Sequence, residues 1–176
     1  VIRCDLQLGH DLTDEEFVKQ FFIDNPADAL VNLYAVNPHV DAKDNSTNMF
    51  DITLDSLNLY LQVNLLSLFS VCREFARNNK AGSIINFSST YGIVSPNPQL
   101  YREGKEKHIG YCVSKSGVVQ LTRYFYLPYL YIWDNIPIWS IIKTLLAFIL
   151  FLSAFENNNP LACFRRILIL LNSWGA

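Results

Sequence analysis

Tyr111 and Lys115 are a pair of residues whose types and spacing suit proton transfer. They lie four positions apart near the start of an expected helix, so their side chains share one helical face. A free phenol, with a pKa of about 10, is a weak acid at neutral pH. A nearby ammonium group stabilises the phenolate and lowers that pKa. The pair therefore suits a general acid or base that exchanges a proton with a substrate oxygen.

Three further polar residues lie where a parallel sheet would bring them toward this pair. Ser88 and Ser89 follow a strand-type run, at the carboxyl end where α/β sheets bind ligands. Asn64 lies within an otherwise apolar helical segment, and a buried amide needs hydrogen-bond partners. Each residue also has a structural interpretation, because the serines could cap the strand end and Asn64 could be a satisfied core amide.

The elements that would position these residues alternate between strands and helices. Thr13, with Glu16 three residues later, forms a capping box that predicts the start of a helix. Leucines at helical spacing predict a longer helix that begins at Thr53. The expected helices cover about 13–22, 53–78 and 111–124, and the expected strands cover 29–33 and 83–87. This order predicts an α/β fold with parallel strands joined by right-handed crossovers.

Over roughly residues 5–126 the chain resembles the classical short-chain dehydrogenase/reductase family. Five motifs occur in the family's order: Asp11-Leu12-Thr13, residues 31–35 with Asn32, Val63-Asn64, residues 88–92 with Ser89, and Tyr111-x-x-x-Lys115. The resemblance implies a partial Rossmann-like, doubly wound parallel sheet in a cytoplasmic protein. It also implies an oxidoreductase that uses NAD or NADP to interconvert a small-molecule alcohol and carbonyl.

The resemblance gives four residues catalytic roles. It implies that Tyr111 is the general acid or base, and that Lys115 lowers the pKa of Tyr111. Ser89 would hydrogen-bond the carbonyl oxygen, and Asn64 would hold a proton-relaying water. Ser89 is preferred over Ser88 because its spacing from Gly92 matches the family motif. The hydride would come from the nicotinamide.

The resemblance also implies a cofactor site and an oligomeric state. The expected cofactor-binding residues are Asp11, Leu12, Asn32, Tyr111 and Lys115, with Lys115 on the ribose. Asp5 competes with Asp11 for the adenine contact, and Asp11 is preferred because Thr13 is expected to cap the next helix. Homo-oligomers in the family commonly pack through the helices that correspond to those of Asn64 and Tyr111.

The glycine-rich phosphate-binding turn of dinucleotide-binding folds does not occur in these 176 residues. Asn32 is followed by Leu33-Tyr34-Ala35, where the family has Asn-Ala-Gly. We therefore expect an N-terminally truncated and impaired enzyme. Two alternatives stay open: a non-catalytic remnant of the family, or a membrane-associated protein with a vestigial dehydrogenase domain.

The composition changes near residue 126, which suggests a partial Rossmann domain over 1–126 and an atypical hydrophobic segment over 127–176. Between residues 127 and 155 the charged residues are Asp134 and Lys143. The apolar stretch 136–155 is long enough to span a bilayer. An out-of-frame or degraded tail is the preferred interpretation, and a membrane span or a buried helix are the alternatives.

Charge and composition argue against several other functions. The formal net charge of −2 provides no strong field that would attract nucleic acid. The four cysteines are far apart in sequence, which argues against a zinc site or a disulfide framework. We expect no metal site, and we expect His10, His39 and His108 to be solvated.

Overall fold

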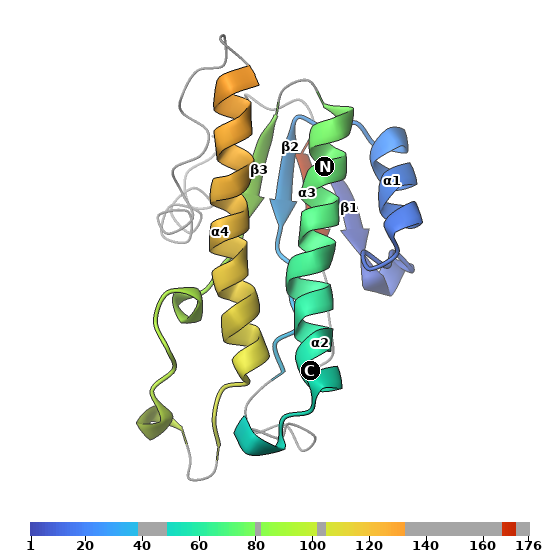
Figure 1. Ribbon diagram of the computed structural model, residues 1–176. Helices are drawn as coiled ribbons and strands as arrows, with labels where there is room; N and C mark the ends of the chain where they lie inside the picture. Colours follow the sequence, from blue (N-terminus) through green and yellow to red (C-terminus); the bar gives the residue numbers. More distant parts are fainter. Residues whose placement is uncertain (39–48, 80–81, 102–104, 133–166, 172–176) are drawn as a thin grey trace, which may run out of the picture.

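The fold is built on a four-stranded sheet in which all the described strand pairs are parallel. The computed structural model describes residues 1–38, 49–79, 82–101, 105–132 and 167–171. The strands are β1 (Ile2–Asp5), β2 (Ala29–Asn32), β3 (Ser83–Asn86) and β4 (Ile167–Leu171). Their order across the sheet is β1-β4-β2-β3 (Figure 1). The predicted α/β class with parallel strands is therefore confirmed.

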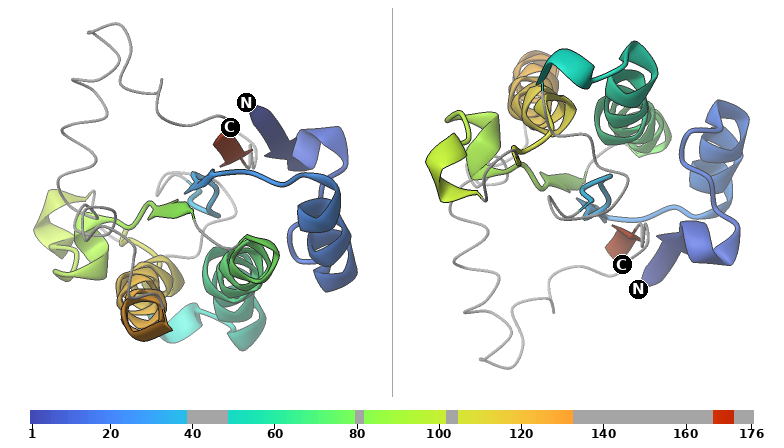
Figure 2. Two further views of the ribbon diagram at one scale, coloured as in Figure 1. Left: turned by 90° about the horizontal axis from the view of Figure 1, so that it is seen from above. Right: turned by 90° about the horizontal axis from the view of Figure 1, so that it is seen from below.

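Helices α3 and α4 lie side by side on one face of the sheet, and α1 packs beside α3 (Figures 1 and 2). The α-helices are α1 (Glu15–Asp24), α2 (Leu54–Leu61), α3 (Ser67–Asn78) and α4 (Ile109–Ile132). A π-helical turn, η3 (Gln62–Leu66), joins α2 to α3. Short 3₁₀ turns are η1 (Leu6–Leu8), η2 (Met49–Asp51), η4 (Thr90–Gly92) and η5 (Pro98–Leu100).

The predicted cap of the first helix is wrong by one residue. Asp14 is the N-cap, and its Oδ1 accepts hydrogen bonds from the backbone N–H groups of Glu16 and Phe17 at 3.0 and 3.1 Å. Thr13 instead donates to Asp11 through both its backbone N–H and its hydroxyl. A carboxylate at the N-cap satisfies two helical donors and also favours the helix dipole, so Asp14 takes the position.

The predicted long helix over 53–78 is present, but the π-helical turn interrupts it. The helix begins at Thr53, as predicted; Thr53 is its N-cap, and its hydroxyl accepts from Ser56 N–H at 3.1 Å. The turn η3 contains Asn64, whose side chain bonds outside its own helix. π-turns inside helices are often found at functional sites, and the leucine periodicity contained no sign of this one.

The hydrophobic C-terminal segment contributes to the same sheet. α4 runs past residue 126 to Ile132, so the proposed domain boundary lies inside a helix. Strand β4 lies between β1 and β2, with Leu168 opposite both Ile2 and Leu30. The stretch 136–155 lies outside the described residues. Within the part that the structure describes, no helix has the length and apolar character of a bilayer span.

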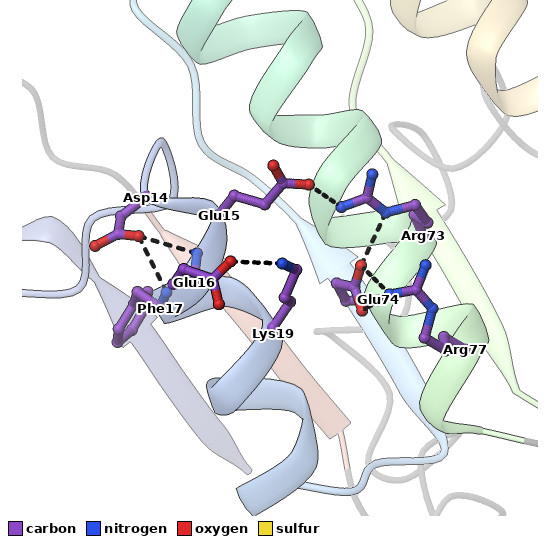
Figure 3. A network of polar contacts seen from close by, with 8 residues as sticks. All are labelled: Asp14, Glu15, Glu16, Phe17, Lys19, Arg73, Glu74 and Arg77. Carbon is purple, nitrogen blue, oxygen red and sulfur yellow. Dashed lines mark hydrogen bonds and ion pairs between the residues drawn. The ribbon is translucent and has the colours of Figure 1, made fainter.

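A buried core and an ion-pair network hold the helices against the sheet. Core side chains include Phe22 of α1, Leu30 of β2, Val71 of α3 and Val118 of α4. Glu74 of α3 is 1% exposed and binds two arginines. Its carboxylate accepts from Arg73 Nε at 2.8 Å and from Arg77 at 2.9 Å (Figure 3).

Arg73 extends the network to α1, where it pairs with Glu15 (Figure 3). Glu74 is therefore a buried anion held by two cations, and Glu16, paired with Lys19 on the surface of α1, is its exposed counterpart.

We expect Glu74→Gln to lower the free energy of unfolding by about 2 kcal/mol, because the neutral amide loses charge-assisted hydrogen bonds. The matched change Glu16→Gln should cost less than about 0.5 kcal/mol, as is usual for exposed ion pairs. Urea denaturation of both variants measures the difference. Equal effects would show that the buried network does not hold α1 to α3.

Candidate functional site

The candidate site lies at the carboxyl ends of β2 and β3, beside the first turns of α4. The backbone leaves β3 through Phe87, Ser88 and Ser89, and α4 presents Tyr111 and Lys115 to this segment. The carboxyl edge of a parallel sheet is the usual position of a ligand site in α/β folds. The structure therefore brings together the serines, the tyrosine and the lysine that the sequence singled out.

Lys115 is a buried cation. Its residue is 5% exposed, and its ammonium donates to the Phe87 carbonyl oxygen at 2.7 Å. Burial lowers the pKa of Lys115 to about 8, because the charged form loses solvation. An ammonium has three N–H donors, so this contact leaves others for a ligand at the strand end.

Tyr111 departs from the expected electrostatics. Burial raises the pKa of its phenol, and a hydrogen bond with Ser89 partly offsets that rise. The expectation that Lys115 lowers this pKa is wrong. The Lys115 ammonium lies 5.8 Å from the centre of the Tyr111 ring and donates to the strand-end carbonyl. Desolvation of the phenol is the largest effect on its pKa and outweighs the lowering by Ser89.

Ser88 and Ser89 have different partners, which supports the choice of Ser89. The Ser88 hydroxyl donates to the Lys115 backbone carbonyl at 2.7 Å and so ties the loop to α4. The Ser89 side chain lowers the pKa of the Tyr111 phenol, and its hydroxyl accepts from Tyr91 N–H at 3.2 Å. Gly92 makes the close approach possible, since a Cβ there would lie 2.6 Å from the Lys115 carbonyl oxygen.

Asn64 connects the loop after β2 to α4. Its Oδ1 accepts from Val36 N–H at 2.6 Å, and its Nδ2 donates to Val36 O and to the Ser114 hydroxyl, both at 3.1 Å. Both amide hydrogens are therefore used, while an amide oxygen can accept a second bond. The residue is 2% exposed. Asn64 therefore joins the Val36 backbone on one side of the site to the Ser114 side chain of α4 on the other.

Asn32 lies in a different buried network. Its Nδ2 donates to Asn86 Oδ1 at 2.7 Å and lies 3.6 Å from Cys72 Sγ, and Asn86 in turn donates to Thr122 at 3.0 Å. Asn32 Oδ1 is buried and has no hydrogen-bond partner among the described residues. The side chain thus links β2 to β3 and α3.

The expected adenine-binding residues lie just past the carboxyl end of β1. Asp11 is exposed and closes a turn by accepting from Thr13 N–H at 2.9 Å, while Leu12 is buried. Asp5 is 1% exposed, pairs with Arg3 at 2.6 Å and accepts from Gln7 N–H at 3.1 Å. Of the two acids, Asp11 is the accessible one.

The residues present fit one half of a dinucleotide better than the other. The buried Lys115 ammonium, with donors to spare beside Tyr111, is suited to the hydroxyls of a ribose. The glycine-rich turn that binds a pyrophosphate does not occur in the sequence. Within the described residues, no cluster of three or more His, Cys, Asp or Glu side chains could hold a metal ion.

Two residues at the site were missed. His108, expected to be solvated, is 2% exposed and stacks on Tyr60 with ring centroids 4.3 Å apart. Its Nδ1 accepts from Gly110 N–H and its Nε2 contacts the Ser56 hydroxyl, both at 3.0 Å, so the ring is neutral with its proton on Nε2. Burial lowers the pKa of His108, as does the nearby Lys107.

Lys107 is the second missed residue, and its ammonium lies 4.7 Å from the centre of the Tyr111 ring. The sequence did contain a signal for Lys107 at the site, because Lys107 precedes Tyr111 by four residues just as Lys115 follows it by four. No local pattern marked His108, whose burial depends on Tyr60 of α2.

Comparison with known proteins agrees with this fold. A short-chain dehydrogenase from Leptospira borgpetersenii with bound NAD⁺ is 24% identical, with a TM-score of 0.56, over 68% of this chain and 47% of that one. A putative gluconate dehydrogenase from Agrobacterium tumefaciens is 21% identical, with a TM-score of 0.55, over 70% and 49%. 4-Hydroxyisoleucine dehydrogenase complexed with NADH is 21% identical, with a TM-score of 0.54, over 68% and 49%.

The chain spans about half the length of these structures, and the likeness shows the fold. A search of curated protein sequences gives no significant match. The family model described as enoyl-(acyl carrier protein) reductase matches residues 2–129, which include the five motifs and the assembled site. The chain therefore belongs to the short-chain dehydrogenase/reductase family of oxidoreductases.

Proposed function

We propose that this site serves an NAD(P)-dependent oxidoreductase that interconverts an alcohol and a carbonyl. The observation that carries the proposal is the buried Tyr111 phenol, whose ring centre lies 5.8 Å from the buried ammonium of Lys115 at the β3 end. A buried cation next to a buried phenol costs stability, and such groups concentrate at functional sites.

Tyr111 would exchange the proton with the substrate oxygen. Its raised pKa keeps the phenol protonated at neutral pH, which is the state that donates a proton to a carbonyl undergoing reduction. Ser89 would hydrogen-bond the same oxygen and hold it within reach. Asn64 would hold a relaying water through the remaining acceptor position of its Oδ1. A bound nicotinamide supplies the hydride.

Lys115 would hold the nicotinamide ribose, and Asp11 and Leu12 would contact the adenine end. Asn32 would contribute through its position at the end of β2. Either NAD or NADP is compatible with these residues. Because the pyrophosphate-binding turn does not occur in the sequence, we propose that this chain binds the dinucleotide weakly and turns over slowly. We further propose a cytoplasmic homo-oligomer that packs through α4, which holds Tyr111, and through the α2–η3–α3 segment, which holds Asn64.

The test of this proposal is ligand-induced stabilisation. We expect millimolar NADH or NADPH to raise the unfolding temperature of the whole chain, and Lys115→Met to abolish the rise. Lys105→Met, on the loop before α4, is the matched control that should keep it. The proposal fails if millimolar NADH and NADPH both leave the unfolding temperature unchanged.

A non-catalytic remnant of the family is the second candidate, and the lack of a glycine-rich turn in the sequence favours it. It predicts that neither cofactor shifts the unfolding temperature, so the same measurement separates the two candidates.

A further inference from the structure

Lys107 is a second lysine at the Tyr111 ring that the proposed chemistry does not use. It comes from the loop before α4, is half-buried, and its ammonium lies 4.7 Å from the ring centre. It also donates a hydrogen bond to the side-chain oxygen of Asn37, which follows β2. Burial lowers the pKa of Lys107, so its charge is held at some cost in solvation.

Neither of the two partners that the described residues provide for Lys107 carries a negative charge. A phenol ring and an amide oxygen attract an ammonium only through a quadrupole and a dipole. The neighbouring acid in sequence, Glu106, is exposed, and no ion pair joins the two among the described residues. His108, next in the chain, is neutral.

The described part of this site therefore holds two positive charges and no acidic side chain paired with either of them. Lys115 adds a second buried ammonium, whose partner is also a neutral oxygen, the Phe87 carbonyl. Two desolvated cations beside one phenol, with no acidic partner among the described residues, favour a ligand that brings a negative charge.

We propose that Lys107 and Asn37 form a carboxylate subsite, so that the substrates are oxo acids or hydroxy acids. This proposal rests on the proposed function, since it takes Tyr111 as the group that meets the substrate carbonyl oxygen. Lys107 would bind the carboxylate while Tyr111 and Ser89 hold the oxygen that reacts. Lys115 follows Tyr111 in the sequence, and its ammonium donates to the Phe87 carbonyl at the end of β3. It would still bind the cofactor ribose, as proposed above.

Calorimetric titration of the whole chain without cofactor tests the subsite. The probes are pyruvate, 2-oxobutyrate and benzoylformate, each against its methyl ester, which keeps the reacting carbonyl and removes the charge. We expect at least one acid to bind wild type tenfold or more tightly than its ester. Lys107→Met should remove that preference, whereas Lys107→Arg and the loop control Lys105→Met should keep it.

Three results would overturn the proposal of a carboxylate subsite. One is that no acid binds better than its ester, and another is that Lys107→Met keeps the preference. The third is that Lys107→Met removes the stabilisation by NADH, which would assign the lysine to a cofactor phosphate. Failure of the proposed function appears separately, as the lack of any stabilisation of wild type by NADH or NADPH.

Discussion

Lys115→Met should raise the free energy of unfolding at pH 7 by about 2 kcal/mol. A pKa lowered from 10.5 to about 8 corresponds to about 3 kcal/mol of disfavoured charge in the folded chain. The Met variant avoids this cost but loses the hydrogen bond to Phe87 O, which reduces its gain in stability by about 1 kcal/mol. A substitution that stabilises the protein is what we expect at a residue that is kept for binding or chemistry.

The pH dependence of this gain has a definite sign. Below pH 8 Lys115 is protonated in both states, so wild type bears the full cost of the buried charge. Between pH 8 and about 10.5 the folded chain has released the proton and the unfolded chain has not. Wild-type stability therefore rises with pH, and the advantage of the Met variant disappears by about pH 10.5.

Urea denaturation at pH 7 and pH 10 measures both effects, with Lys105→Met as the control for removing a lysine from the same region. A Met variant that is less stable than wild type at pH 7 would show that the Lys115 ammonium stabilises the fold. In that case its role at the site would be structural.

Asn64→Leu should lower the free energy of unfolding by about 3 kcal/mol. The change removes the buried partners of Val36 N–H, Val36 O and the Ser114 hydroxyl together. A buried donor or acceptor left without a partner costs about 1–3 kcal/mol. The π-helical turn at Asn64 should also relax toward a regular helix, because it is the Asn64 side chain that makes the hydrogen bonds from η3 to Val36.

Asn58→Leu is the matched control, since Asn58 lies exposed on the preceding helix α2. It should change stability by less than about 0.5 kcal/mol. Chemical denaturation gives the two values, and amide hydrogen exchange at Val36 reports directly on the broken contact. Equal stabilities of the two variants would show that Asn64 does not hold the site together.

The main helices, and the positions of Tyr111 and Lys115 near the start of one of them, could be predicted from sequence because their signals are local. Hydrophobic spacing, the helix start at Thr53 and the Tyr111–Lys115 separation each depend on a few neighbouring residues. The family match over 2–129 agrees with the motifs that predicted it.

What could not be predicted depends on contacts between distant segments. The burial of His108 requires Tyr60, and the raised pKa of Tyr111 follows from its desolvation in the assembled site. Strand β4 lies in the middle of the sheet, where Leu168 is opposite Ile2 of β1 and Leu30 of β2. These pairings connect residues that are far apart in the sequence. No periodicity in the hydrophobic segment indicated that pairing.

A fluorescence titration that compares NADH with reduced nicotinamide mononucleotide tests the central claim most directly. The claim is that the chain assembles the proton-transfer and ribose-binding half of a dehydrogenase site without the pyrophosphate-binding turn. We therefore expect both ligands to bind with affinities within about threefold, because the adenylate half adds little, and Lys115→Met to weaken both. Saturable NADH binding more than tenfold tighter than the mononucleotide, or no saturable binding of either, would contradict it.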